Sequence, residues 1–166
     1  MSEPSTVPAA PTRSTDHASF SIERHVAHPP ELVFRAFAEP AAKAAWFVGP
    51  EGWQSGNHTL DFRVGGLEHL ETTLPNGGPR ITFDATYLDL VPDERIIYAY
   101  EMTVDGQRIS TSLACLVFHR VDGGTHLTVT EHGIFLDGLD RVEERKRGTH
   151  QLLDQLAGWL DRGAVA

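Results

Sequence analysis

The sequence predicts an α+β domain in which a curved antiparallel sheet of about seven strands wraps around one long C-terminal helix. Alternating apolar segments between residues 59 and 132 are joined by turns rich in Gly, Pro and Asp, as in antiparallel hairpins. Residues 139–160 change to a helical period, with their apolar side chains mainly on one stripe. Only this helix is large enough to cover the apolar face of such a sheet, so we expect a cavity between the two.

Length and composition set broad limits. The 166 residues are most simply one domain, which we place at residues 18–162. Residues 1–17 hold Pro, Ser, Thr and Ala without an apolar run, and we expect a disordered tail there. The formal net charge of -9 argues against binding of nucleic acid or of an anionic membrane. No signal-like or membrane-spanning apolar run occurs, and Cys115 is the only cysteine, so we expect a soluble cytoplasmic protein.

The first elements follow from alternation and from prolines. Residues 19–26 alternate as a strand with one buried face. Pro30 suits the first turn of a helix over residues 32–37, because its missing N–H costs nothing there. Pro40 should end that helix and start a second one that finishes near Phe47.

The remaining elements are strands and the long helix. The dipeptide Asp105-Gly106 predicts a two-residue hairpin turn, and we expect the first strand to pair with the last. Asp137 or Asp140 is the expected N-cap of the helix over residues 139–160. The six further strands are predicted at residues 59–64, 67–74, 80–91, 95–104, 108–120 and 125–132.

Five short segments carry a family resemblance through their order and spacing. They are Val33-Phe-Arg-Ala-Phe37, Ala45-Trp-Phe47 with Gly49-Pro50, Asp61-Phe-Arg-Val-Gly-Gly66, Tyr87-Leu-Asp-Leu-Val-Pro-Asp-Glu-Arg-Ile96 and Gly124-Thr-His-Leu-Thr-Val-Thr130. In these the chain resembles the START/Bet v 1-like superfamily, within the group named for the C-terminal domain of the activator of Hsp90 ATPase. The resemblance covers about residues 20–160.

The resemblance implies a helix-grip fold with a cavity between sheet and helix, but no particular reaction. Relatives include lipid carriers, hormone receptors and aromatase/cyclases, and many of these proteins pair, so a homodimer is one expectation. The chain departs from the family pattern in the last helix. Gly148-Thr149-His150 stands where family members often have Gly-Trp, and loss of this aromatic ring should reshape the cavity or its mouth.

The residues expected to contact a ligand are mainly aromatic side chains on faces that we expect to be buried. Any one of them alone is more often plain core packing, but together they would line an apolar pocket. A buried tyrosine hydroxyl also needs a hydrogen-bond partner, which a ligand can supply. The candidates are Trp46, Phe47, Trp53, Phe62, Phe83, Tyr87, Tyr98, Tyr100 and Phe118, with Leu153 on the last helix.

Three polar residues complete the candidate site. Glu131 has the strand parity of Leu127 and Val129, so it points inward if they do, and burial would then raise the pKa of its carboxyl. The alternative is that the strand ends earlier and Glu131 is solvated. Thr149 and His150 are expected to reach the cavity from the helix. We assign no catalytic residue, no metal ligand and no cofactor, because the nine histidines are scattered without metal-ligand spacing.

We therefore expect a binding protein for a small hydrophobic or aromatic molecule, rather than an enzyme. The alternative is a cyclase/aromatase-like or hydrolase-like enzyme that uses Glu131, His150 and the tyrosines in the same cavity. An Hsp90 co-chaperone is suggested only by the family name. We do not expect that partner, because one domain leaves no room for a separate chaperone-binding domain.

Overall fold

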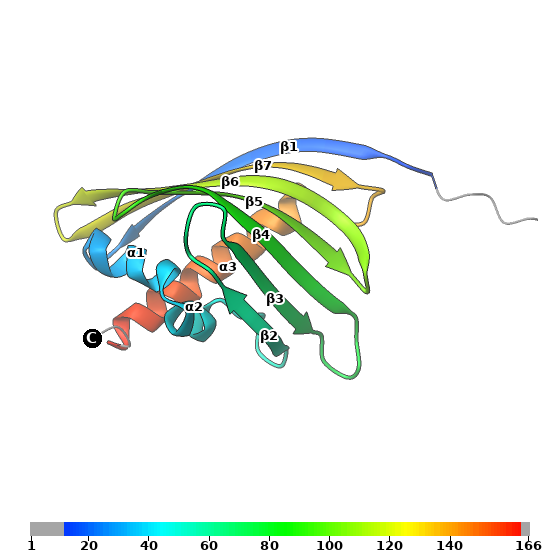
Figure 1. The fold of residues 1–166 in the computed structure, drawn as a ribbon, viewed down its shortest axis with the longest axis horizontal. Helices are drawn as coiled ribbons and strands as arrows, with labels where there is room; N and C mark the ends of the chain where they lie inside the picture. The colour runs from blue at the N-terminus through cyan, green and yellow to red at the C-terminus, as the bar shows by residue number, and fades with distance from the viewer. Residues whose placement is uncertain (1–11, 164–166) are drawn as a thin grey trace, which may run out of the picture.

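A computed structural model describes residues 12–163 and has seven strands and three helices (Figure 1). All seven strands form one antiparallel sheet in the order β1-β7-β6-β5-β4-β3-β2. The α+β class and the pairing of the first strand with the last are confirmed. The elements are β1 (Thr15–Val26), α1 (Pro30–Ala38), α2 (Pro40–Trp46), β2 (Gln54–Leu60), β3 (Leu67–Thr73), β4 (Arg80–Val91), β5 (Arg95–Val104), β6 (Gln107–Val121), β7 (Gly124–Leu136) and α3 (Val142–Asp161).

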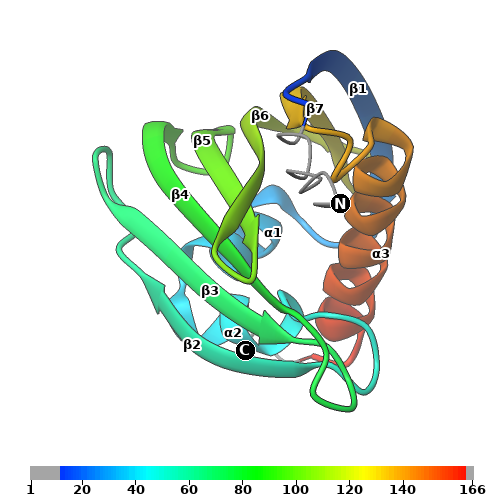
Figure 2. The same ribbon diagram turned by 90° about the vertical axis from the view of Figure 1, so that its right-hand side faces the viewer.

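The sheet is strongly curved, and α3 lies against its inner side (Figure 1). In Figure 2 the strands follow an arc from β1 to β2, and α3 lies across the open side of that arc. The short helices α1 and α2 pack at one end, where they contact each other and α3. This is the helix-grip arrangement that the sequence predicts.

The two prolines act as predicted. Pro30 opens α1 and Pro40 opens α2. Glu39 lies between the two helices in an extended conformation, with φ -86° and ψ 123°, because a residue that precedes proline is kept out of the helical region. The indole N–H of Trp46 donates to the carbonyl of Ala36 at 2.8 Å and fixes the angle between the helices.

The Asp105-Gly106 hairpin is also confirmed. The two residues have φ of 49° and 81°, as a type I′ turn requires, and this turn matches the right-handed twist of the flanking strands. It connects β5 to β6, the strands that form the middle of the sheet.

The predicted strand over residues 59–64 is wrong in position. The strand is β2, which ends at Leu60, and residues 61–66 form a turn. Gly65 has φ of 82°, and a Cβ on Gly66 would lie 1.9 Å from the carbonyl oxygen of Asp61. The turn is therefore built for glycine. The Phe62 side chain packs against the core although it lies in this turn. An apolar residue at this position therefore resembles the buried residue of a strand in the sequence.

Both predicted boundaries at the chain ends need correction. β1 begins at Thr15, and Asp137 accepts hydrogen bonds from the Arg13 side chain at 2.8 Å and from the Ser14 N–H at 2.9 Å. Residues 15–17 are therefore sheet, whereas residues 1–11 of the predicted tail lie outside the described residues. α3 starts at Val142 with Arg141 as N-cap and no side-chain cap, so Asp137 and Asp140 do not cap it.

The inner face of the sheet carries the core. The larger apolar cluster joins the three helices to β1, β4, β5, β6 and β7, and a smaller one joins β3, β4, β5 and β6. Within residues 12–163, no helix combines the length and the apolar character that crossing a membrane would require.

Candidate functional site

A cavity of about 390 Å³ lies between α3 and the inner face of strands β3–β7. The segment of residues 47–50 and Trp53, between α2 and β2, closes one side. Its size falls in the usual range for small-molecule sites, roughly 300–1,000 Å³. Its walls are mainly apolar and include Phe37, Trp46, Phe47, Trp53, Leu70, Ile81, Phe83, Met102, Ile109, Leu116, Val129, Leu152 and Leu153.

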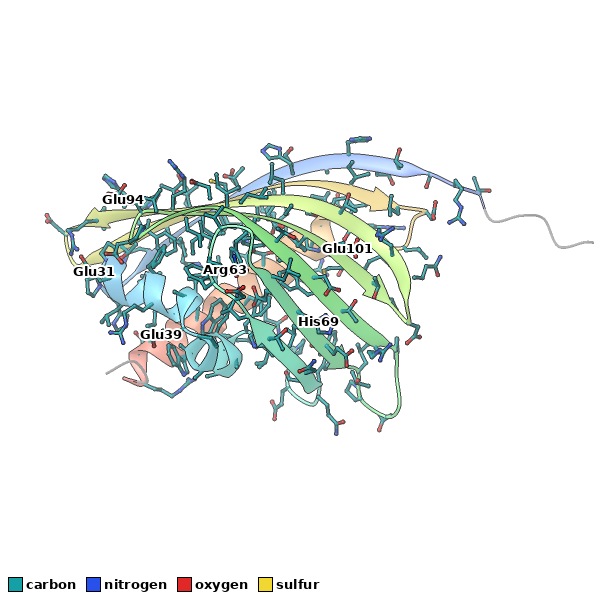
Figure 3. The ribbon with its side chains drawn as sticks, viewed as in Figure 1. Glu31, Glu39, Arg63, His69, Glu94 and Glu101 are labelled. Atoms are coloured by element: carbon teal, nitrogen blue, oxygen red, sulfur yellow. The ribbon has the colours of Figure 1, made fainter. Side chains whose placement is uncertain are left out.

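A broader hollow of about 1120 Å³ lies on the outer face of the sheet. It is lined largely by polar and small side chains, and His69 and Glu101, both labelled in Figure 3, belong to it. This hollow is more open to solvent than the smaller cavity, and most of its lining residues are polar. We therefore place the candidate site in the smaller cavity, which combines apolar walls with a few polar groups.

The structure brings nine of the predicted ligand contacts together in the cavity wall. Adjacent rings form a continuous aromatic surface: the centroids of Phe47 and Phe83 lie 5.2 Å apart, and those of Phe83 and Tyr100 lie 4.9 Å apart. The nine are Trp46, Phe47, Trp53, Phe83, Tyr98, Tyr100, Glu131, Thr149 and Leu153.

Four predicted contacts lie elsewhere. Phe118 packs between the rings of α1, and Phe62 packs against the rings of Phe34 and Tyr87. Tyr87 belongs to a separate polar cluster. His150 is exposed, with Nδ1 3.2 Å from Arg24. The assignment of His150 to the cavity is wrong, because the helical turn aims Thr149 inward and its neighbour outward.

Glu131 is buried in the cavity wall, with 5% of its surface exposed. The alternative of a solvated carboxylate is therefore excluded. The Tyr100 hydroxyl donates to Oε1. Thr149 reaches Oε2 at 3.4 Å, but its hydroxyl has a closer acceptor in the Arg145 carbonyl at 2.9 Å. Burial raises the pKa of Glu131 against the opposing effect of Tyr100 and Arg145.

Arg145 is the hub of this polar end of the cavity. Its Nη2 donates to Asp140 at 2.5 Å and to Ser110 at 2.7 Å. Its Nη1 donates to the Tyr100 hydroxyl at 2.9 Å and to Ser112 at 3.4 Å. The sequence predicts a solvated helix face here, because Arg145 lies in a run of mixed charges. Nothing in that run distinguishes it from its neighbours.

A second buried ionic cluster lies outside the cavity, between α2 and the sheet. Lys43 Nζ donates to Glu68 Oε2 at 2.7 Å and to the Tyr87 hydroxyl at 3.2 Å. Tyr87 also donates to Glu68 at 2.6 Å, and the other Glu68 oxygen lies 2.9 Å from His58 Nε2. The Lys43 ammonium also makes a cation–π contact with the Phe47 ring, 4.7 Å from its centroid. The sequence signal is a lone lysine in the otherwise apolar helix Pro40–Trp46.

Glu68 has a lowered pKa in this cluster. Burial alone would raise it, but Lys43, His58 and Tyr87 together hold the pKa at about 2. Within residues 12–163, no three His, Cys, Asp or Glu side chains come close enough to hold one metal ion.

The comparisons with known proteins agree with this fold. The sequence matches the family described as Activator of Hsp90 ATPase homolog 1-like protein over residues 27–161. The chain belongs to this family. A comparison with curated proteins found no match.

Solved structures of bacterial relatives share both sequence and fold. An uncharacterised protein of Rhizobium leguminosarum is 43% identical, with a TM-score of 0.86 over 91% of this chain and 99% of that one. A protein of Rhizobium loti is 40% identical, with a TM-score of 0.80 over 87% and 98%. A protein of Chromobacterium violaceum is 31% identical, with a TM-score of 0.74 over 84% and 94%.

Two residues of the last helix with small side chains lie at the cavity. Gly148 and Thr149 both line it. A Cβ on Gly148 would meet no atom within 4 Å. The space beside Gly148 is therefore open to a larger side chain.

Proposed function

We propose that the protein binds a small hydrophobic or aromatic molecule in the cavity between the sheet and α3. The observation that carries the proposal is a cavity of about 390 Å³ with aromatic walls and one polar end. Burial of apolar ligand surface against such walls contributes roughly 25 cal/mol per Å². The polar end would then orient the ligand.

Two measurements test the binding. Native mass spectrometry compared with denaturing mass spectrometry should reveal a mass excess that is lost on unfolding, and it also gives the subunit count. In parallel, the neutral probe N-phenyl-1-naphthylamine should fluoresce on binding. If neither a copurified mass nor probe binding below millimolar concentration is found, the proposal fails.

A cavity-filling variant assigns the probe to the cavity. Gly148→Leu puts a larger side chain into the open space beside Gly148 and also raises helix propensity. Probe affinity should fall by about tenfold or more while the fold is kept. The matched control is Lys146→Leu, an exposed position on the same helix, which should leave probe affinity unchanged. Equal affinity in both variants would place the probe elsewhere.

We propose general acid–base catalysis as the second candidate. It is supported by Glu131, a buried carboxyl in the cavity wall whose pKa is raised by burial. His150 takes no part, because it is exposed and does not line the cavity. A suitable probe is 2-tetralone, whose α-hydrogens exchange with D₂O. Acceleration that is lost in Glu131→Gln would support catalysis, and no acceleration by the wild type would dispose of it for this probe.

A cytoplasmic location is part of the proposal. It is supported by the lone Cys115, a half-buried free thiol that suits a reducing compartment. Cell fractionation tests it.

A further inference from the structure

The positive charge of Arg145, at the polar end of the cavity, is balanced by Asp140. Arg145 donates to Asp140, Ser110 and the Tyr100 hydroxyl. The side chains of Arg145 and Asp140 are only 10% and 14% exposed, so the pair forms a neutral unit in a weakly screened environment. With Glu131 nearby, the described part of this wall offers a ligand no spare cation.

Hydrogen-bonding capacity, in contrast, is left over. Glu131 Oε2 has one contact, Thr149 at 3.4 Å, and the Thr149 hydroxyl has a closer acceptor at 2.9 Å. A carboxylate oxygen can accept two hydrogen bonds. Glu131 therefore presents an under-used oxygen at the wall of the cavity.

Tyr98 is the second group with unused capacity. The hydroxyls of Tyr87 and Tyr100 both donate to carboxylates, whereas that of Tyr98 makes no hydrogen bond within residues 12–163. No side-chain polar atom of these residues is both sealed from solvent and unpartnered, so the Tyr98 hydroxyl has accessible surface. Tyr98 lines the cavity, and burial raises the pKa of its phenol, so it stays a neutral donor.

We propose that this site selects a neutral ring compound that carries a hydroxyl group, and that it rejects the corresponding carboxylate. The inference rests on the proposed function and adds the chemical class of the ligand. The ligand hydroxyl can donate to Glu131 and accept from Tyr98. A carboxylate would approach Glu131 and Asp140 with like charge. The charge of Arg145 is already balanced by Asp140, and both of its Nη groups donate to protein acceptors.

Three probes of equal ring size test the class: naphthalene, 2-naphthol and 2-naphthoate, each by displacement of N-phenyl-1-naphthylamine. In the wild type, 2-naphthol should bind about tenfold more tightly than naphthalene, and at least tenfold more tightly than 2-naphthoate. Tyr98→Phe should remove most of the gain of 2-naphthol and leave naphthalene unchanged.

Asp140→Asn tests the charge argument directly. It releases the charge of Arg145 and should improve 2-naphthoate binding by about tenfold, with little effect on naphthalene. The matched control, Asp154→Asn, removes an exposed carboxylate from α3 that pairs with Arg24, and it should not change the order of the probes. Unchanged 2-naphthoate binding in a folded Asp140→Asn protein would overturn the role of the pair.

The affinities of the three probes for the wild-type protein test the inference without any variant. If the three probes bind equally, or 2-naphthoate binds best, the inference is wrong although the cavity binds ligands. If naphthalene, 2-naphthol and N-phenyl-1-naphthylamine all fail to bind, the proposed function itself is wrong.

Discussion

Glu68 and Glu131 are both buried carboxylates that accept a hydrogen bond from a tyrosine, yet their surroundings differ. Glu68 also contacts Lys43 and His58, so its charge is matched and its pKa is lowered to about 2. Among residues 12–163 no cation forms an ion pair with Glu131, since Arg145 pairs with Asp140 instead. Burial raises the pKa of Glu131. A buried carboxylate whose charge and hydrogen bonds are all matched by protein groups is structural. One with an unmatched oxygen is available to a ligand.

The Lys43 cluster should be the more important for stability. Lys43→Met leaves Glu68 buried without its cation, so we expect a loss of about 3–5 kcal/mol in the free energy of unfolding. Urea denaturation measures it. The control is Arg63→Met, which breaks the exposed pair with Asp61 and should cost no more than about 1 kcal/mol. Similar losses in both variants would remove the distinction between a buried and an exposed pair.

The two carboxylates should give pH dependences of opposite sign. The folded-state pKa of Glu68 is about 2 against an ordinary value of 4.5. Its contribution, about 3 kcal/mol, is therefore present above 4.5 and lost as the pH falls towards 2. The pKa of Glu131 is raised, so its contribution is present below 4.5 and lost as the pH rises through the raised value.

Matched glutamine variants separate these two effects. Glu68→Gln should flatten the acid side of the stability curve, and Glu131→Gln should flatten the side above about pH 4.5. Denaturation at about pH 3, pH 5 and pH 8 measures both. The comparison breaks if Glu131→Gln instead removes stability only at low pH.

A surface pair gives the smallest effect and serves as a reference. His69 Nδ1 lies 2.6 Å from Asp84 on the outer face of the sheet, and this hydrogen bond raises the pKa of His69. Its contribution is present below 6.5 and lost as the pH rises through the raised value. Asp84→Asn should cost less than about 1 kcal/mol near pH 6 and almost nothing near pH 9. A larger loss would mean that outer-face pairs matter as much as buried ones.

Alternation predicts the faces of the long strands well. Leu127, Val129 and Glu131 are all buried on the inner face of β7, as their shared parity predicts. Alternation does not locate β2, because Gln54–Leu60 is polar on both faces and has no apolar period. The partly buried Phe62 lies in the turn after β2, and it shifts the predicted strand towards the C-terminus.

The polar parts of the site were harder to predict. Lys43 meets Glu68 from 25 residues away, and Arg145 meets Ser110 from 35 residues away. Such contacts depend on how the helices are placed on the sheet, which local periodicity does not encode. The contrast between Thr149 and His150 likewise depends on the rotation of α3, and one residue of helical phase moves a side chain by about 100°.

The pairing of β1 with β7 has a consequence for folding kinetics. Five of the six strand pairings join neighbours in the chain, whereas Val26 pairs with Thr125 and Thr15 with Leu136. The β1–β7 ladder closes a loop of about a hundred residues, and such non-local contacts slow folding because chain entropy is lost before the contact is gained. The meander from β2 to β7 can form hairpin by hairpin. We therefore expect the β1–β7 ladder to form last and to limit the folding rate of the domain.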